Sequence, residues 1–339
     1  MRLSVLDQSV AIAGRPHAAS IHETLALAQH CETLGFHRFW VSEHHNHDTI
    51  VGTAPEILMA AIAARTSRIR IGSAGVMLPH YSALKVAEQF RVLDALAPGR
   101  IDLGVGRAPG SDGRTAFALN PNANEAAEAF PRQVRDLEAW VTGNALPEGH
   151  PFQQVRAFPA GETSPDLWIL GSSNYGAQVA AHFGLPYCFA HFITDGRGAK
   201  EAVELYRDTY QPSPRFPNPV AVLCVWALAA ETDAEATRLF WPRAKWKLYR
   251  DRGAIPPLES ASDAAAHPYT AEELQRVAQI RSQSLVGSVA TVAERLRAVA
   301  SACGVDELAV LTWSDDPAAR SHSYTLLARA FNLSRSNAA

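Results

Sequence analysis

The strongest constraint on the fold is a strict alternation of short apolar runs with longer helix-like runs along the 339 residues. The apolar runs are rich in β-branched and aromatic residues, and a segment with helical spacing follows each of them. Such alternation predicts parallel strands joined by crossover helices. The expected strands are Leu3–Leu6, Arg38–Val41, Ile69–Ala74, Ile101–Val105, Leu167–Leu170, Tyr187–Ala190, Val220–Ala229 and Glu307–Leu311.

Eight such units in a chain of this length predict an α/β fold, namely one (β/α)8 TIM barrel domain over residues 1–339. An open, doubly wound sheet is the second possibility. The strands are apolar almost throughout, as a sheet covered by helices requires. Residues 233–285 form a longer helical stretch than the other units need. We therefore expect an insertion there, before the last helix–strand units, with the length of a lid.

Helix starts are expected at recognisable capping residues. Ser20 with Glu23, and Thr53 with Glu56, have the spacing of a capping box ahead of the first two helices. An irregular segment is expected over 143–165, where proline and glycine gather. Further helices are expected over Ser82–Leu96, Asn124–Val141, Asn174–Phe183, Ala199–Tyr210, Ser288–Ser301 and Ala318–Phe331.

Composition excludes several classes of function. The formal net charge is −3 and the isoelectric point is about 6.5, so no basic face for nucleic acid or anionic membrane is expected. The four cysteines (Cys31, Cys188, Cys224 and Cys303) form no C-x-x-C pair and read as small buried hydrophobic residues. We see no signal peptide, and the apolar run over 219–230 is too short to span a bilayer. A cytoplasmic location is therefore expected.

The stretch FWVSEHHNHD (39–48) brings three histidines and two carboxylates together after the second strand. Loops at the carboxyl ends of barrel strands carry the chemistry, so this loop lies on the working face. His45 and His47 form the H-x-H pair of barrel metallohydrolases, which His191 and Asp315 could complete. In those enzymes, however, the pair follows the first strand. The alternatives are an acid–base site and an ordinary polar loop.

The stretch LGVGRAPGSDGR (103–114) resembles a dinucleotide fingerprint but departs from it. Gly104 and Gly106 fit G-x-G, whereas Pro109 occupies the position of the third glycine. The glycines still allow the backbone to approach a ligand, and Arg107 can pair with a phosphate. A plain strand-end turn with a surface arginine is the alternative.

A second candidate for anion binding lies in LGSSNYGAQVAAHFGLP (170–186). A strand ends there and a helix begins, so backbone N–H groups and the helix dipole favour an anion. The hydroxyl groups of Ser172, Ser173 and Tyr175 add donors, and Gly176 leaves space. An N-cap serine without any ligand is the alternative. In GSAGVMLPHY (72–81), small residues leave room either for a flat ring or for a closely packed neighbouring strand.

Three long stretches together resemble the bacterial luciferase-like flavin monooxygenases. They are GFHRFWVSEHHN, IGSAGVMLPHYSALKVAEQFRVLDALAPGRIDLGVGRAPGSD and LGSSNYGAQVAAHFGLPYCFAHF, and SLVGSVATVAERLRAVASACGVDELAVLTW is similar to the same family. The resemblance covers nearly the whole chain and is greatest to the single-subunit, non-luminescent branch. Light-emitting members have a reactive cysteine where this chain has Gly106, which argues against light emission.

The resemblance implies a TIM barrel that binds FMN, usually in reduced form supplied by a separate reductase. It places His44 beside the flavin as an acid–base group, a role that suits an imidazole. It also implies a cis peptide at Ala74–Gly75 under the ring, and it places His191 near the ring or the substrate. The flavin phosphate would lie near Arg107 and near the serine loop (Ser172, Ser173, Tyr175 and Gly176).

The expected function is that of an FMN-dependent monooxygenase that uses O2 to oxidise a small organic substrate, such as an aldehyde or ketone. Other possibilities are a deazaflavin (F420)-dependent hydride-transfer enzyme, a non-catalytic flavin-binding protein and, more remotely, a zinc-dependent barrel hydrolase. Glu43 has two open roles: orienting His44 or capping the loop. A homodimer formed through helices of the first half is common in the family and is expected here.

Overall fold

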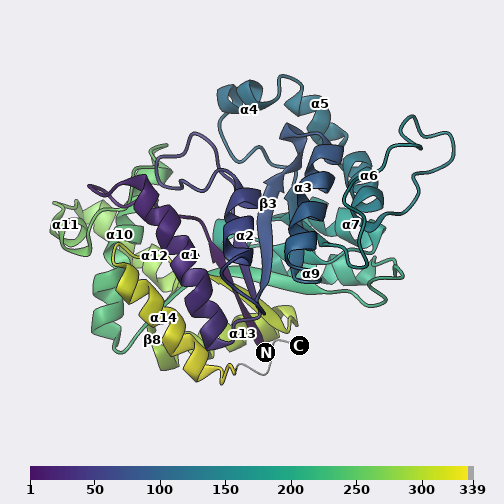
Figure 1. The fold of residues 1–339 in the computed structure, drawn as a ribbon. Helices are drawn as coiled ribbons and strands as arrows, with labels where there is room; N and C mark the ends of the chain where they lie inside the picture. Colours follow the sequence, from purple (N-terminus) through teal and green to yellow (C-terminus); the bar gives the residue numbers. More distant parts are fainter. Residues whose placement is uncertain (335–339) are drawn as a thin grey trace.

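Eight parallel strands pair edge to edge until the sheet closes on itself in the computed structural model, which describes residues 1–334 (Figure 1). Each strand from β1 to β6 pairs with the next, β6 pairs with β7, β7 with β9, and β9 with β1. The predicted TIM barrel is thereby confirmed. The strands are β1 (Arg2–Asp7), β2 (Arg38–Val41), β3 (Arg70–Met77), β4 (Ile101–Gly106), β5 (Asp166–Gly171), β6 (Tyr187–Phe189), β7 (Ala221–Ala230) and β9 (Glu307–Leu311).

A short extra strand, β8 (Leu285–Ser288), was not expected from the sequence. It pairs with the last four residues of β7, Ala227–Ala230, whereas Val222–Trp226 of β7 pair with β9 inside the barrel. The ten residues of β7 therefore extend past the closed barrel and offer a free edge to β8. This pairing joins segments that are distant in sequence, so no local pattern predicts it.

One helix packs outside the barrel for each strand, and α1 lies beside α14, so the first and last helices are neighbours (Figure 1). The outer helices are α1 (His17–Leu34), α2 (Pro55–Ala63), α3 (Ala83–Leu96), α6 (Phe130–Thr142), α7 (Asn174–Phe183), α9 (Ala199–Asp208), α13 (Val289–Cys303) and α14 (Pro317–Ala330). Shorter or inserted helices are α4 (Gly113–Leu119), α5 (Ala123–Glu128), α8 (His191–Thr194), α10 (Asp233–Asp251), α11 (Ala261–Ala266) and α12 (Ala271–Gln283), with a 3₁₀ turn η1 (Leu78–His80).

The predictions of capping boxes at Ser20–Glu23 and at Thr53–Glu56 are wrong. The N-cap of α1 is Pro16, and the N-cap of α2 is Ala54, so neither helix begins with a side-chain cap. Pro16, and Pro55 at the first position of α2, have a fixed φ that starts a helix without such a cap. A capping box does form at α12, between Thr270 and Glu273.

The expected helix over Asn124–Val141 is in fact two helices, α5 and α6. Pro131, in the first turn of α6, lacks the N–H that a continuous helix would need. Helix α4 had not been expected either; Asp112 caps it by accepting hydrogen bonds from the backbone of Arg114 and Thr115.

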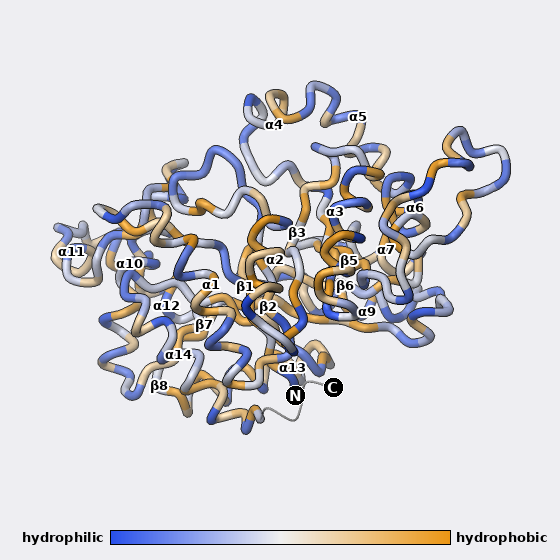
Figure 2. Tube along the Cα trace, viewed as in Figure 1, coloured by the Kyte–Doolittle hydropathy of each residue, from blue (hydrophilic) through white to orange (hydrophobic). Residues whose placement is uncertain are grey.

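Apolar side chains gather on both faces of the sheet. Figure 2 colours each residue by hydropathy, and orange, hydrophobic residues recur along the barrel strands. The outer layer fills the space between strands and helices. The inner layer fills the barrel and includes four tryptophans, Trp40, Trp168, Trp226 and Trp313. Part of α10 also packs into the inner layer, through Leu239, Phe240 and Trp246. Helix α10 therefore covers part of the barrel.

Buried charges fill the end of the barrel where the strands begin. Arg38 donates to Asp102 at 2.8 Å and to Glu307 at 2.9 Å, and Arg70 donates to Asp102 at 2.6 Å. Burial opposes ionisation of Asp102, but Arg38 and Arg70 outweigh it and lower the pKa of Asp102 to about 2. This network closes the amino-terminal end, which leaves the carboxyl ends of the strands for chemistry.

The stretch over 233–285 lies between β7 and β8 and contains α10, α11 and α12. That it acts as a lid remains a prediction, as does the single domain over 1–339, whose last five residues, 335–339, lie outside the described part. In residues 1–334 no helix has the length and apolar character needed to cross a bilayer.

Candidate functional site

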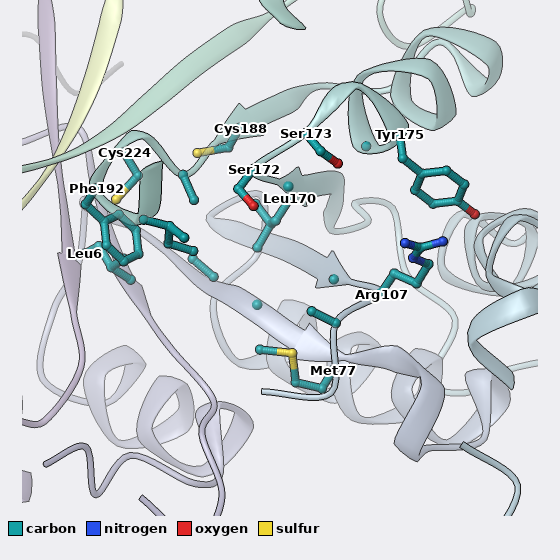
Figure 3. Close-up of a pocket in the computed structure, with 18 of the residues that line it drawn as sticks. Leu6, Met77, Arg107, Leu170, Ser172, Ser173, Tyr175, Cys188, Phe192 and Cys224 are labelled. Carbon is teal, nitrogen blue, oxygen red and sulfur yellow. The ribbon is translucent and has the colours of Figure 1, made fainter. Parts of the chain in front are cut away.

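A cavity of about 290 Å³ lies at the carboxyl ends of the strands (Figure 3). Its walls come from the ends of β1, β3, β4, β5, β6 and β7 and from the loops that follow them. Eight of the nine residues proposed from the sequence line it: His44, Ala74, Gly75, Arg107, Ser172, Ser173, Tyr175 and Gly176. The fold therefore brings together residues from four separate segments of the chain.

One end of the cavity is rich in hydrogen-bond donors. The guanidinium carbon of Arg107 lies 4.0 Å from the centre of the Tyr175 ring, and within residues 1–334 no carboxylate pairs with this arginine. Ser173 is the N-cap of α7, yet its hydroxyl does not cap the helix. Figure 3 shows Ser172, Ser173, Tyr175 and Arg107 around the same space. A cation, two hydroxyls and a helix N-terminus form a donor set suited to a phosphate.

The middle of the cavity is apolar and closely fitted. The peptide bond between Ala74 and Gly75 is cis, as the family resemblance implied. A methyl group on Gly75 would lie 2.3 Å from the Leu170 side chain and 2.7 Å from the carbonyl oxygen of Gly104, so only glycine fits there. Met77 completes this region. The small and apolar lining suits a flat aromatic ring.

His44 is held at both ring nitrogens. Its Nδ1 lies 3.3 Å from the carbonyl oxygen of Gly110, and its Nε2 lies 3.5 Å from the amide nitrogen of Gln8. The amide oxygen of Gln8 accepts a hydrogen bond of 3.1 Å from the indole of Trp313.

These contacts determine the tautomer of His44. An indole N–H can only donate and a carbonyl can only accept, so Gln8 presents its NH2 group to Nε2 while Nδ1 carries the proton. Burial lowers the pKa of His44, although the hydrogen bond to Gly110 works in the opposite direction. His44 is therefore a neutral imidazole with its lone pair at Nε2.

Glu43 does not contact His44. Its carboxylate accepts hydrogen bonds from the hydroxyl of Tyr81 at 2.6 Å and from the backbone N–H of Met77 at 3.1 Å, and it lies 2.7 Å from Nε2 of His45. Of the two roles left open for Glu43, the structure supports that of holding the loop. The loop after β2 is thereby tied to the end of β3.

His45 and His47 engage different partners. Nδ1 of His47 accepts hydrogen bonds from the backbone N–H groups of Thr49 and Ile50, both at 3.1 Å. Burial lowers the pKa of His47 to about 4. Within residues 1–334, no three histidine, cysteine, aspartate or glutamate side chains are placed to hold a metal ion. The contacts of His45 with Glu43, and of His47 with the backbone of its own loop, help to hold that loop in place.

The ninth proposed residue, His191, does not line the cavity, and its place near the ring or the substrate stays a prediction. It begins the short helix α8, and its ring lies against Gly196, where a methyl group would approach Nε2 to 2.5 Å. The next two residues, Phe192 and Ile193, line the cavity instead. Successive residues of a helix point about 100° apart, so a histidine that starts a helix can turn away while its neighbours face inward.

Sequence reasoning missed several residues of the apolar end. Leu6, Phe192, Cys188 and Cys224 lie together there, away from Arg107 and Tyr175 (Figure 3). Burial raises the pKa of both cysteine thiols, so neither is a thiolate. Gln8 was also missed, although a polar residue just past the first strand is a signal of a barrel site.

The sequence is similar to that of one family of known proteins over nearly its whole length. A family model described as luciferase-like monooxygenase matches residues 1–307. A luciferase-like monooxygenase of Escherichia coli K12 is 40% identical over 328 residues, which cover 95% of each chain. The N-acetyl-S-alkylcysteine monooxygenase of Bacillus subtilis is 35% identical, covering 97% of this chain and 98% of its own.

A solved structure, that of apo-MsnO8, is similar in fold and sequence. It superposes with a TM-score of 0.89 at 38% identity and covers 98% of this chain and 99% of its own. Fold and sequence therefore point to the same family.

Proposed function

The chain belongs to the luciferase-like monooxygenase family and is a flavin-dependent oxidoreductase, and we propose that it uses reduced FMN and O2 to oxygenate a small organic substrate. The observation that carries the choice of FMN is the group of uncommitted donors at one end of the cavity. We propose that a separate reductase supplies the reduced cofactor. Aldehydes and ketones are the first substrates to test. Thioethers are the second, since the Bacillus relative is named for an S-alkylcysteine derivative.

The phosphate of FMN would be held by Arg107 and by the serine loop. The side chain of Arg107 stacks on Tyr175 and has no carboxylate partner within residues 1–334, so it is free to form a charged hydrogen bond. The hydroxyls of Ser172 and Ser173 and the first N–H groups of α7 surround the same space. Each of these donors favours a dianionic group over a neutral one.

The ring of FMN would lie over Ala74 and Gly75, among Met77, Leu170 and His44. When bound, a reduced flavin supplies the electrons and the oxygen chemistry of such enzymes. The lining of this region is mostly apolar and excludes water from the ring. The task of the protein is therefore to bind the ring, to shield it and to manage protons.

His44 is the group that would manage protons. Because Nδ1 is committed to Gly110, proton transfer takes place at Nε2. The contact of Nε2 with Gln8 is long, at 3.5 Å, so a ligand O–H or N–H can replace it at low cost. A neutral imidazole in this position accepts a proton from the substrate side and returns it later.

The test is oxygen consumption by the purified protein with FMN, NADH and a flavin reductase, across matched aldehydes, ketones and thioethers. We expect oxygen uptake coupled to formation of an oxygenated product. FMN binding without substrate-dependent product would favour a flavin-binding protein. Oxidation of reduced F420 without oxygen uptake would favour a deazaflavin enzyme.

We also propose a homodimer that forms through α2 and α3. These two helices contact each other and expose three large apolar side chains: Ile57 (67% exposed), Val92 (48%) and Leu96 (61%). Val92 and Leu96 are four residues apart in α3 and so lie on the same face of that helix. Large apolar side chains exposed on two neighbouring helices are typical of a surface that another chain covers.

A further inference from the structure

Helix α10 carries three buried cations, and one of them lacks a partner. Lys247 pairs with Asp195 at 2.8 Å, and Lys245 pairs with Glu259 at 2.6 Å. Arg243 is only 4% exposed, yet within residues 1–334 no carboxylate pairs with it and its Nε is buried without a hydrogen bond. Burying a charge without a counter-charge is strongly unfavourable. The exception therefore calls for a functional explanation.

Two indole rings hold the guanidinium of Arg243. Its central carbon lies 4.2 Å from the ring centre of Trp226 and 5.1 Å from that of Trp313. Stacking on aromatic rings orients the guanidinium but leaves its N–H groups without acceptors. Burial lowers the pKa of Arg243 to about 9, with a further contribution from Arg250, and Asp195 only partly offsets this.

The two tryptophans that hold Arg243 are each linked to a residue that lines the cavity. Trp226 lies two residues beyond Cys224 in β7, so both side chains point into the barrel, and Cys224 lines the cavity. Trp313 donates a hydrogen bond to Gln8, which lines the cavity beside His44. Cys224 and Phe192 lie at the end of the cavity away from Arg107 (Figure 3).

We infer that Arg243 binds a carboxylate of the substrate, and that the enzyme acts on small organic acids whose reacting atom lies between this carboxylate and His44. A planar guanidinium pairs with a carboxylate through two parallel hydrogen bonds, and Trp226 and Trp313 hold it in a fixed orientation. The inference rests on the proposed function, because it assigns to the substrate the end of the cavity opposite the phosphate donors.

Ligand binding tests this inference without turnover. Isothermal titration calorimetry would compare straight-chain carboxylates from butanoate to octanoate with the primary amide of each, in wild-type protein saturated with FMN. We expect at least one carboxylate to bind about tenfold more tightly than its amide, as a charged hydrogen-bonded pair provides. Arg243→Met should abolish this preference, and Arg243→Lys should retain part of it. Absence of a preference in the wild type, or its persistence in Arg243→Met, would overturn the inference.

A matched control separates binding from structure. Lys247→Met leaves the partly buried Asp195 without its cation and should lower the melting temperature of the ligand-free protein. Arg243→Met leaves no anion unpaired and should raise the melting temperature of the ligand-free protein. A loss of stability in Arg243→Met as large as in Lys247→Met would make Arg243 a structural cation and would contradict the inference. FMN titration by fluorescence should give the same affinity in all variants; failure of the wild type to bind FMN would count against the proposed function instead.

Discussion

The side-chain nitrogen of Gln8 lies 3.5 Å from Nε2 of His44, and this contact places an N–H donor against the nitrogen that must accept a proton. The orientation of the Gln8 amide is fixed by Trp313, whose indole N–H donates a hydrogen bond to the amide oxygen. Residues after three different strands, β1, β2 and β9, therefore determine the tautomer of one imidazole.

Replacement of Gln8 by glutamate should change the protonation of His44. A carboxylate next to Nε2 accepts a hydrogen bond and favours the protonated imidazole, so the pKa of His44 should rise. The acidic limb of the kcat–pH profile should move to higher pH as a result, while FMN affinity stays within about threefold of the wild type. An unchanged profile in Gln8→Glu would show that the contact does not control His44.

His44→Ala should separate chemistry from binding. Loss of a general acid–base group typically lowers turnover by about 10²–10⁴-fold. His44 lies beside the expected ring rather than the phosphate donors, so the dissociation constant of FMN should change little. Turnover is measured by product formation and affinity by flavin fluorescence. Equal turnover in the two proteins would remove His44 from the mechanism.

The buried network at the amino-terminal end of the barrel should control acid stability. The pKa of Asp102, about 2 when folded, lies below its unfolded value of about 3.9. The unfolded state therefore binds the proton more readily. The stabilisation is present above about pH 4 and is lost as the pH falls towards 2.

Arg38→Met should lower the free energy of unfolding at pH 7 by about 3–5 kcal/mol, because it leaves Asp102 and Glu307 without this cation. The control is the exposed pair of Lys200 and Glu204. Lys200→Met should lower the free energy of unfolding by less than about 1 kcal/mol. Urea denaturation measures both variants. If Arg38→Met lowered the free energy of unfolding as little as Lys200→Met, the buried network would not stabilise the barrel.

Much of the fold is visible in the sequence because parallel strands buried on both faces are apolar runs with clear ends. Arg38–Val41, Glu307–Leu311 and the helix Asn174–Phe183 match the structure residue for residue. The short strand β8 escaped prediction because its partner, the end of β7, lies about 55 residues away. No local pattern records such a pairing.

The site was partly predictable for a related reason. Residues that follow strand ends, such as His44 and Arg107, must face the same side of a barrel. His191 is not among the residues that line the cavity, because it begins α8 and its ring lies against Gly196. Arg243 sits in a charged helical stretch that resembles a solvent-exposed face, and only the packing of α10 on the barrel reveals that it is buried.

If the dimer forms through α2 and α3, charged residues on that surface should change the oligomeric state. Ile57→Glu combined with Leu96→Glu should convert the protein to a monomer, because two charges would enter an apolar contact. Sedimentation velocity reports the state, and the equally exposed Phe117→Glu on α4 is the control. A wild-type protein that sediments as a monomer would contradict the proposed dimer.

We propose above all that the protein captures a flavin by its phosphate, between Arg107 and the serine loop. The most direct test compares the affinities of FMN and riboflavin, which differ only in that phosphate, for the wild type and for Arg107→Met. We predict that the wild type prefers FMN by at least about tenfold and that Arg107→Met loses most of this preference while its riboflavin affinity is unchanged. Equal affinities for the two flavins in the wild-type protein would contradict the account.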